Sequence, residues 1–222
     1  MRAAVLTAFA VMIPAMISCK PATSTKVASE TQSAQSTSIQ IQLDVKQPEK
    51  SMGILSGGSD NLAFTVGYGK YGIACEDSAF SEGLTPVGTF RVNAILGVDR
   101  FDMDPALIKK SGKSKNYLKA NLFSNMNSID FKGDGEVGEY GDGYISLEPV
   151  STTPQPFSFN DYAGTFRWYS FAIHGTNNDQ RVGQKVTGGC LNVAQKDLET
   201  LMKTIKLGDE VTITANGPCQ KS

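Results

Sequence analysis

The stretch that decides the fold and the chemistry runs from Ile173-His174-Gly175-Thr176 to Thr187-Gly188-Gly189-Cys190-Leu191-Asn192. His174 is the only histidine of the chain, and Cys190 follows it 16 residues later. A thiol attacks a carbonyl only as a thiolate, and a free cysteine, with a pKa of about 8.5, is mostly protonated at neutral pH. A positioned imidazole can remove that proton. The pair therefore predicts a cysteine nucleophile with His174 as its base.

The two glycines before Cys190 fit this chemistry. Without a Cβ, the backbone at Gly188 and Gly189 can approach a substrate carbonyl and turn its N–H groups inward. The N–H groups of Gly189 and Cys190 are then natural oxyanion donors. A helix start shortly after Cys190 would also favour the thiolate. The competing interpretation is that Cys190 is a small buried apolar residue and His174 a structural imidazole.

Short apolar runs separated by glycine, proline and asparagine surround this stretch. They read as strands at residues 62–68, 88–96 and 166–173. In the second run, polar Thr89, Arg91 and Asn93 alternate with apolar residues, which predicts one wet face and one packed face. We therefore expect a mainly antiparallel β domain.

One helix is predicted after the nucleophile. Leu198, Leu201, Met202 and Ile205 fall at i, i+3, i+4 and i+7, and Gly208 is placed to end the helix. The pattern also allows a second short helix ending at Ser111, with Asp104 as N-cap and Pro105 at its first position.

These motifs together resemble the L,D-transpeptidase (YkuD-like) family. The resemblance is carried by residues 173–176, Val182-Gly183, residues 187–192, Leu198 with Leu201, and Gly208–Ile213, and it extends upstream to Leu84-Thr85-Pro86-Val87-Gly88-Thr89-Phe90. It implies a β-sandwich-like domain that acts on peptidoglycan stem peptides and needs no metal or other cofactor.

The resemblance also implies roles for individual residues. Cys190 would form a thioester with the L-centre before a terminal D-residue, and His174 would act as general base and then general acid. The carbonyl of Gly175 would orient the imidazole, while the backbone at Gly188 and Gly189 would form the oxyanion site. Thr187 and Asn192 would support the turn, and Asn192 has substrate contact as a second interpretation.

One departure from the family pattern concerns Gly188, because the family frequently has histidine two residues before the nucleophile. Three functions therefore compete: an acyltransferase, a hydrolase of the same linkages, and a cell-wall-binding module without catalysis. The sequence does not separate the first two, because the difference lies in whether the site excludes water and positions an amine. It also leaves the oligomeric state open.

The N-terminus reads as an export signal. Met1-Arg2 precedes an apolar run from Ala3 to Ile17, which is shorter than the roughly 20 residues of a membrane-spanning helix. Met16-Ile17-Ser18-Cys19 resembles a bacterial lipobox, which implies cleavage before Cys19 and a lipid on it. We therefore expect a signal peptide at 1–18, a disordered tether at 19–52 and a catalytic domain at 53–217. Lys20 favours the outer membrane over the inner one, with the domain on the periplasmic side of the envelope.

Charge and cysteine content restrict the partners. The chain has 21 Lys and Arg against 22 Asp and Glu, which does not suggest a nucleic-acid binder. Besides Cys19 there are three cysteines, and in an oxidising envelope we expect Cys75 and Cys219 to form a disulfide, leaving Cys190 free.

An acidic, glycine-rich stretch at residues 130–142 invites a calcium interpretation. It fails the EF-hand pattern, because Lys132 stands at the third ligand position and Gly141 where the bidentate acid belongs. We expect a solvated hairpin or a loop beside the substrate.

Overall fold

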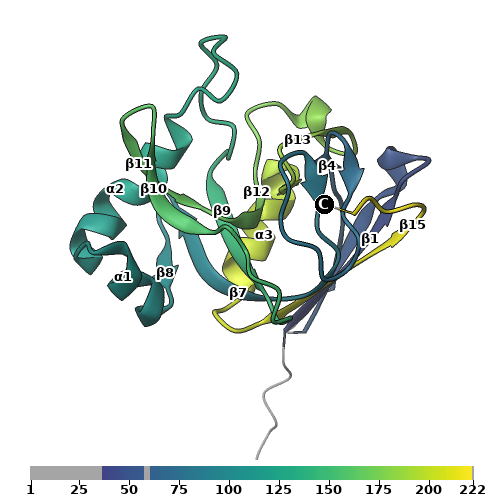
Figure 1. The fold of residues 1–222 in the computed structure, drawn as a ribbon, viewed down its shortest axis with the longest axis horizontal. Coiled ribbons are helices and arrows are strands. Elements are labelled where there is room, and N and C mark those ends of the chain that lie inside the picture. Colours follow the sequence, from purple (N-terminus) through teal and green to yellow (C-terminus); the bar gives the residue numbers. More distant parts are fainter. Residues whose placement is uncertain (1–36, 58–60, 222) are drawn as a thin grey trace, which may run out of the picture. The chain divides into compact units, whose positions relative to one another are not determined.

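The computed structural model describes residues 37–57 and 61–221, and a mainly β domain is built from them (Figure 1). Its largest sheet has the strand order β14-β12-β9-β7-β15-β1-β2-β3, with β8 beside β7. These strands are β1 (Ser38–Asp44), β2 (Met52–Ser56), β3 (Leu62–Thr65), β7 (Gly88–Gly97), β8 (Phe101–Met103), β9 (Gly143–Pro149), β12 (Phe171–His174), β14 (Leu191–Asn192) and β15 (Glu210–Asn216).

Three two-stranded sheets accompany it. They are β4 (Tyr68–Gly69) with β13 (Lys185–Thr187), β5 (Gly72–Ile73) with β6 (Leu84–Thr85), and the hairpin of β10 (Ser158–Tyr162) and β11 (Thr165–Tyr169). The helices are α1 (Pro105–Ser111), α2 (Lys115–Asn127) and α3 (Gln195–Thr204), with short 3-10 turns η1 (Pro48–Lys50) and η2 (Asp179–Arg181).

The main sheet curls around α3. This helix contacts both β9 and β3, which lie far apart in the strand order. The two edges of the sheet also meet, because the backbones of Gly67 and Asn192 exchange hydrogen bonds of 2.9 and 3.1 Å. The expected β-sandwich of two packed sheets is therefore replaced by one half-barrel sheet, as accumulated strand twist allows.

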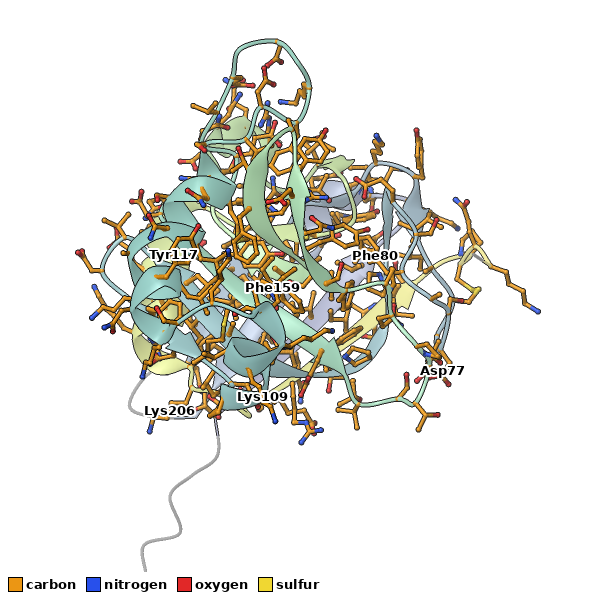
Figure 2. All side chains as sticks on the ribbon, turned by 60° about the vertical axis from the view of Figure 1, so that its left-hand side comes forward. Asp77, Phe80, Lys109, Tyr117, Phe159 and Lys206 are labelled. Carbon is orange, nitrogen blue, oxygen red and sulfur yellow. A yellow bond between two sulfur atoms is a disulfide. The ribbon has the colours of Figure 1, made fainter. Side chains whose placement is uncertain are left out.

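The sheet separates two apolar clusters. Alternation along β9 shows why, since Ile145 and Leu147 belong to the α3 side and Tyr144 to the other. The α3 side contains Leu198, Leu201 and Ile205, which are at most 1% exposed. On the opposite side, α2 and the hairpin β10–β11 pack together. Figure 2 shows this side, with Tyr117 on α2 and Phe159 on β10.

The predicted start of the domain at residue 53 is wrong. β1 begins at Ser38 and lies inside the sheet, paired in parallel with β15 and antiparallel with β2. Ile39, Ile41 and Leu43 are at most 1% exposed, whereas Gln40 and Gln42 face solvent. The polar composition of residues 20–50 obscured this alternation, which is a half-buried strand pattern.

Two of the three described helices were predicted from the sequence. α3 and α1 are confirmed, and the Asp104 side chain caps α1 by accepting from the Ala106 N–H at 2.7 Å. α2 was missed. Its buried residues are Leu118, Leu122 and Met126, spaced by four in an otherwise polar segment, so the apolar stripe is too narrow to stand out.

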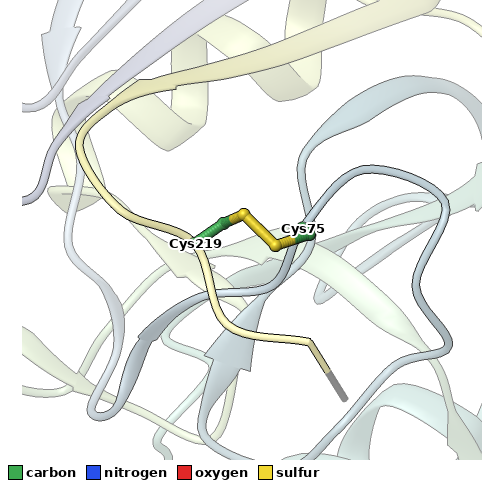
Figure 3. Close-up of a disulfide and its surroundings, with 2 residues drawn as sticks. All are labelled: Cys75 and Cys219. Atoms are coloured by element: carbon green, nitrogen blue, oxygen red, sulfur yellow. A yellow bond between two sulfur atoms is a disulfide. The ribbon is translucent and has the colours of Figure 1, made fainter.

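The C-terminal segment is covalently linked to a segment earlier in the chain. Cys75 and Cys219 form a disulfide across a sequence separation of 144 residues (Figure 3). Gln220 reinforces this connection through backbone hydrogen bonds with Ile73 and Cys75. The ordered domain therefore continues past the expected end at residue 217.

The expected signal peptide, the lipidated Cys19 and most of the tether lie outside the described residues. In the ranges 37–57 and 61–221, no helix has the length and apolar content needed to cross a membrane.

Candidate active site

Strand register brings His174 and Cys190 to the same edge of the sheet. β12 pairs in parallel with β14, so that Ile173 lies opposite Leu191 and His174 opposite Asn192. Cys190, one residue before β14, is thereby level with Ala172. Since alternate residues of a strand share a face, the imidazole and the thiol belong to diagonal positions of neighbouring strands, typically about 7–8 Å apart at the backbone.

The imidazole of His174 is fixed by its surroundings. Its Nδ1 lies 2.6 Å from the carbonyl oxygen of Gly175. Because that carbonyl can only accept, Nδ1 carries the proton and Nε2 is left as the basic nitrogen. The ring of Tyr144 is parallel to the imidazole at a centroid distance of 6.2 Å, and Tyr140 meets it edge-on at 5.0 Å.

Cys190 is a half-buried residue, and its sulfur contacts the backbone of β12 and the residue before it. It donates to the carbonyl oxygen of Ser170 at 3.8 Å, and the Ala172 N–H faces it as a donor. Among the described contacts, the thiol and the imidazole share no hydrogen bond with each other. Both line one pocket, so reaction between them requires the sulfur to leave the Ser170 carbonyl.

Burial keeps both groups neutral at rest. It lowers the pKa of His174 to about 4, against a weaker opposing effect of the Gly175 carbonyl. It also raises the pKa of the Cys190 thiol to about 12, and the carboxylate of Glu82 contributes in the same direction. The expected thiolate-favouring environment is therefore wrong for the resting protein, because desolvation exceeds the favourable polar contacts.

A chain of buried hydrogen bonds runs beneath the thiol. Trp168 Nε1 donates to Ser146 Oγ at 2.9 Å, and Ser146 Oγ lies 2.8 Å from Ser170 Oγ. The Tyr144 hydroxyl donates to the Ser170 carbonyl at 2.9 Å, the same oxygen that the thiol contacts. All four residues are at most 4% exposed. Trp168 is therefore a core residue whose indole N–H takes part in this network.

The turn before Cys190 has two different glycines. Gly189 has a φ of +128°, and a Cβ there would lie 2.9 Å from both the Leu84 carbonyl and the Phe80 ring, so only glycine fits. Gly188 has no such backbone requirement. A Cβ at Gly188 would instead meet the Glu82 carboxylate.

The backbone donors of the turn are unequally available. The Gly189 N–H is engaged by the Thr187 hydroxyl at 3.2 Å, and that hydroxyl also donates to the Cys190 carbonyl at 2.6 Å. Within the described part of the chain, the N–H groups of Gly188 and Cys190 have no hydrogen-bond partner. These two amides are the free candidates for binding an oxyanion.

Thr85 braces this turn from the other side, which sequence reasoning did not anticipate. Its buried hydroxyl donates to the Gly189 carbonyl at 2.7 Å and accepts from the Gly69 N–H at 2.8 Å. Thr85-Pro86 belongs to the stretch that carries the family resemblance, but its contact with the turn before Cys190 spans 104 residues.

The backbone and the side chain of Asn192 have different surroundings. Its backbone joins Gly67 at the seam of the sheet. Its Oδ1 is buried and has no hydrogen-bond partner among the described residues, although the side chain lines the pocket.

The pocket over these residues has a volume of about 580 Å³. Charged side chains in its walls are Glu82, Lys132, Glu139, Arg167 and Arg181. Arg181 pairs with Glu136 at 2.8 Å, and Lys132 with Glu139 at 2.7 Å. The Arg181–Glu136 pair connects the 130–142 loop to the segment after His174, and the Lys132–Glu139 pair lies within the loop. Residues of this loop form one wall of the pocket.

Four acidic residues of that loop have hydrogen-bond or ion-pair partners, namely Asp130, Asp134, Glu136 and Glu139. The Asp130 carboxylate accepts from the N–H groups of residues 132–135, which lowers its pKa. Among the described residues, no group of three or more His, Cys, Asp or Glu side chains is arranged to hold a metal ion.

Comparisons with known proteins give one extensive match. A family model named YkuD, described as the L,D-transpeptidase catalytic domain, matches residues 40–213. No protein with a curated description matches the chain.

Solved structures give distant matches that span about 60% of those chains. L,D-transpeptidase 3 from Mycobacterium tuberculosis, in complex with a faropenem-derived adduct, is 12% identical, with a TM-score of 0.41 and coverage of 80% of this chain and 60% of that one. An L,D-transpeptidase from Mycobacterium smegmatis is 14% identical, with a TM-score of 0.36 and coverage of 81% and 59%. One from Xylanimonas cellulosilytica is 12% identical, with a TM-score of 0.36 and coverage of 82% and 62%.

Proposed function

Since the chain belongs to the YkuD family of L,D-transpeptidase catalytic domains, we propose that it is a cysteine acyltransferase acting on peptidoglycan stem peptides. Cys190 is the nucleophile and His174 the general acid and base. The proposal is supported most directly by the fixed imidazole. Its Nδ1 contacts the Gly175 carbonyl, and its Nε2 has no hydrogen-bond partner among the described residues. The imidazole and the thiol line the same pocket.

The first half of the reaction forms a thioester. The sulfur turns from the Ser170 carbonyl about its single χ1 torsion, and His174 Nε2 takes the thiol proton as sulfur attacks the peptide carbonyl carbon. The N–H groups of Gly188 and Cys190 stabilise the resulting oxyanion. The imidazolium then protonates the leaving amine, and the C–N bond breaks.

The second half transfers the acyl group. A neutral amine attacks the thioester carbonyl while His174 Nε2 accepts its proton. The C–S bond breaks, and the proton returns to sulfur. Both groups are neutral at rest, so His174 Nε2 is available to accept a proton in each half of the reaction.

Replacement of the nucleophile tests this mechanism. Cys190→Ala should reduce acyl transfer between defined muropeptides by at least about 1,000-fold, with an unchanged circular dichroism spectrum. The wild-type protein should gain the mass of the acyl group on Cys190, and the variant should not. Persistent crosslinking by purified Cys190→Ala protein would refute the proposal.

Water as the final acceptor would make the protein a hydrolase. The half-buried position of Cys190 in the wall of the pocket supports this second candidate. Incubation of the acyl-enzyme with and without an amine acceptor distinguishes the two, because a free acid as sole product in both cases indicates hydrolysis. A thiol that fails to react with any donor would indicate a binding module.

We also propose that the domain works on the periplasmic side of the cell envelope, attached to the outer membrane by a lipid on Cys19. The Cys75–Cys219 disulfide supports an oxidising location. Incorporation of labelled palmitate that is lost in Cys19→Ser would support the anchor, and equal labelling of both proteins would refute it.

A further inference from the structure

A concentration of positive charge lies on α1 and α2, outside the Cys190 pocket. Residues 105–127 contain five lysines and neither aspartate nor glutamate, although the whole chain has a net charge of −1. All five are exposed, and within the ranges that the structure describes none forms an ion pair; they are Lys109, Lys110, Lys113, Lys115 and Lys119. We call them the lysine surface. Figure 2 shows this side of the domain, with Lys109 and Tyr117 labelled.

The stability of α2 does not explain its lysines. Lys115 is the first residue of α2, and the first turn of this helix contains no acidic residue. A positive charge at this end opposes the helix dipole, which favours acids there. Lys115 and Lys119 are also four residues apart, a spacing at which like charges repel. The arrangement is unfavourable in the isolated domain and becomes favourable when an anion covers it.

The lysine surface borders a groove between α2 and the β10–β11 hairpin. The groove has a volume of about 520 Å³, and its lining includes Lys113, Tyr117, Asn125, Ser128, Asp161 and Phe166. The Lys113 ammonium lies 5.3 Å from the centres of both the Tyr117 and the Phe166 rings. Aromatic rings, amides and hydroxyls beside an ammonium suit a ligand that carries both sugar rings and carboxylates.

The β10–β11 hairpin also connects this groove with the pocket over Cys190. Phe166 of β11 lines the groove, whereas the next three residues of the same strand line the pocket. α2 packs directly on β11. A polymer that reaches across the hairpin can therefore place one segment in the pocket and another on the lysine surface.

We propose that the lysine surface binds a carboxylate-bearing glycan polymer through a segment that does not react. This inference rests on the proposed function, because the polymer is the peptidoglycan whose stem peptides take part in the proposed acyl transfer. A groove accommodates a strand, whereas a flat anionic membrane would meet only the outermost ammonium groups. Binding of a remote segment strengthens the hold on a polymeric substrate without taking part in the chemistry at Cys190.

Cosedimentation with purified, insoluble peptidoglycan tests this proposal. All proteins carry Cys190→Ala, so that no covalent capture occurs. The further changes Lys113→Gln, Lys115→Gln and Lys119→Gln, made together, should weaken binding at least about tenfold at low salt, and binding of the parent should weaken as salt rises. Lys110 is left intact, because its ammonium donates to the Phe157 carbonyl and lies over the Trp168 ring.

A matched control separates the lysine surface from net charge. Lys46→Gln, Lys50→Gln and Lys196→Gln together remove the same charge from exposed positions outside the lysine surface. This triple variant should bind peptidoglycan like its parent. An equal loss of binding in the two triple variants would overturn the proposal, since it would show that only the total charge matters.

Modified polymer and lipid vesicles test the chemistry of the partner. Peptidoglycan whose carboxylates are converted to amides, with a carbodiimide and ammonia, should no longer bind the parent. Vesicles of phosphatidylglycerol and phosphatidylethanolamine should not sediment it. Undiminished binding to the amidated polymer would overturn the proposal. Binding to the vesicles through the three lysines, without binding to peptidoglycan, would overturn it in favour of a membrane surface.

Turnover distinguishes this inference from the proposed function. With Cys190 present, the triple variant of the lysine surface should keep the wild-type rate on a soluble muropeptide, while its KM for insoluble peptidoglycan should rise about tenfold. Equal losses on both substrates would contradict the proposal. If the wild-type protein forms no thioester, the proposed function fails, while cosedimentation still decides whether the lysine surface binds the polymer.

Discussion

The two faces of the main sheet are built from the same strands but contain different chemistry. On the α3 side, Ile145, Ile173 and Leu191 pack against the helix in an apolar cluster. On the other side, their neighbours Tyr144 and His174 belong to the pocket. Alternation along a strand lets one side supply stability and the other carry polar, reactive groups. Cys190, the expected nucleophile, is therefore positioned by strands whose other face packs in an apolar cluster.

Loss of a large apolar residue on the α3 side should have the greatest effect on stability. Leu201 is fully buried, so Leu201→Ala should lower the free energy of unfolding by about 2–5 kcal/mol, as measured by urea denaturation. Alkylation of Cys190 in the folded variant should stay at the wild-type rate. Lys203→Ala, at an exposed position of α3, is the control and should change stability by less than about 0.5 kcal/mol. A lowered alkylation rate in Leu201→Ala would show that the two faces are coupled.

Acid should destabilise the protein through His174 on the pocket side. The pKa of His174 is about 4 in the folded state, whereas an unfolded histidine titrates near 6.5. Between these values the unfolded chain binds more protons, so stability rises with pH over this window. The contribution should be up to about 3 kcal/mol and should be absent in His174→Gln. The difference between the two proteins, measured by urea denaturation at pH 4.5–6.5, separates the contribution of His174 from that of the titrating carboxylates. The same pH dependence of stability in both proteins would contradict the prediction.

Disruption of the buried polar chain should have a smaller effect. Ser146→Ala removes the acceptor of Trp168 Nε1 and a partner of Ser170, and should cost about 1–3 kcal/mol. Trp168→Phe in the same background removes the stranded donor, so the two changes should be less than additive. Ser81→Ala, outside this network, serves as the control. Full additivity in thermal or urea denaturation would show that the hydrogen bond contributes little.

Local patterns in the sequence predicted the elements that depend on near neighbours. The spacing of Leu198 and Leu201 identified α3, and Asp104 with Pro105 identified α1. The motifs around His174 and Cys190 singled out two residues that the structure places in one pocket. In each case the physical signal lies within a few residues, where helix periodicity and turn chemistry operate.

Features that depend on distant contacts were missed. β1 was predicted to be part of the tether, because its alternating apolar residues form a buried strand only when β1 pairs with β15. Glu82 carried no signal, since its approach to Gly188 crosses more than a hundred residues. The resting state of the thiol was also mispredicted. Burial of Cys190 by β12 and the pocket walls controls its pKa, and a sequence motif does not contain that information.

The position of β15 has a consequence for the order of assembly. This strand is the last of those that the structure describes, yet it lies in the middle of the sheet and joins β7 to β1. Until residues 210–216 are in place, the strands on either side of β15 have no common partner. The half-barrel, and with it the placement of His174 and Cys190 on neighbouring strands, therefore depends on a segment that is synthesised after both residues.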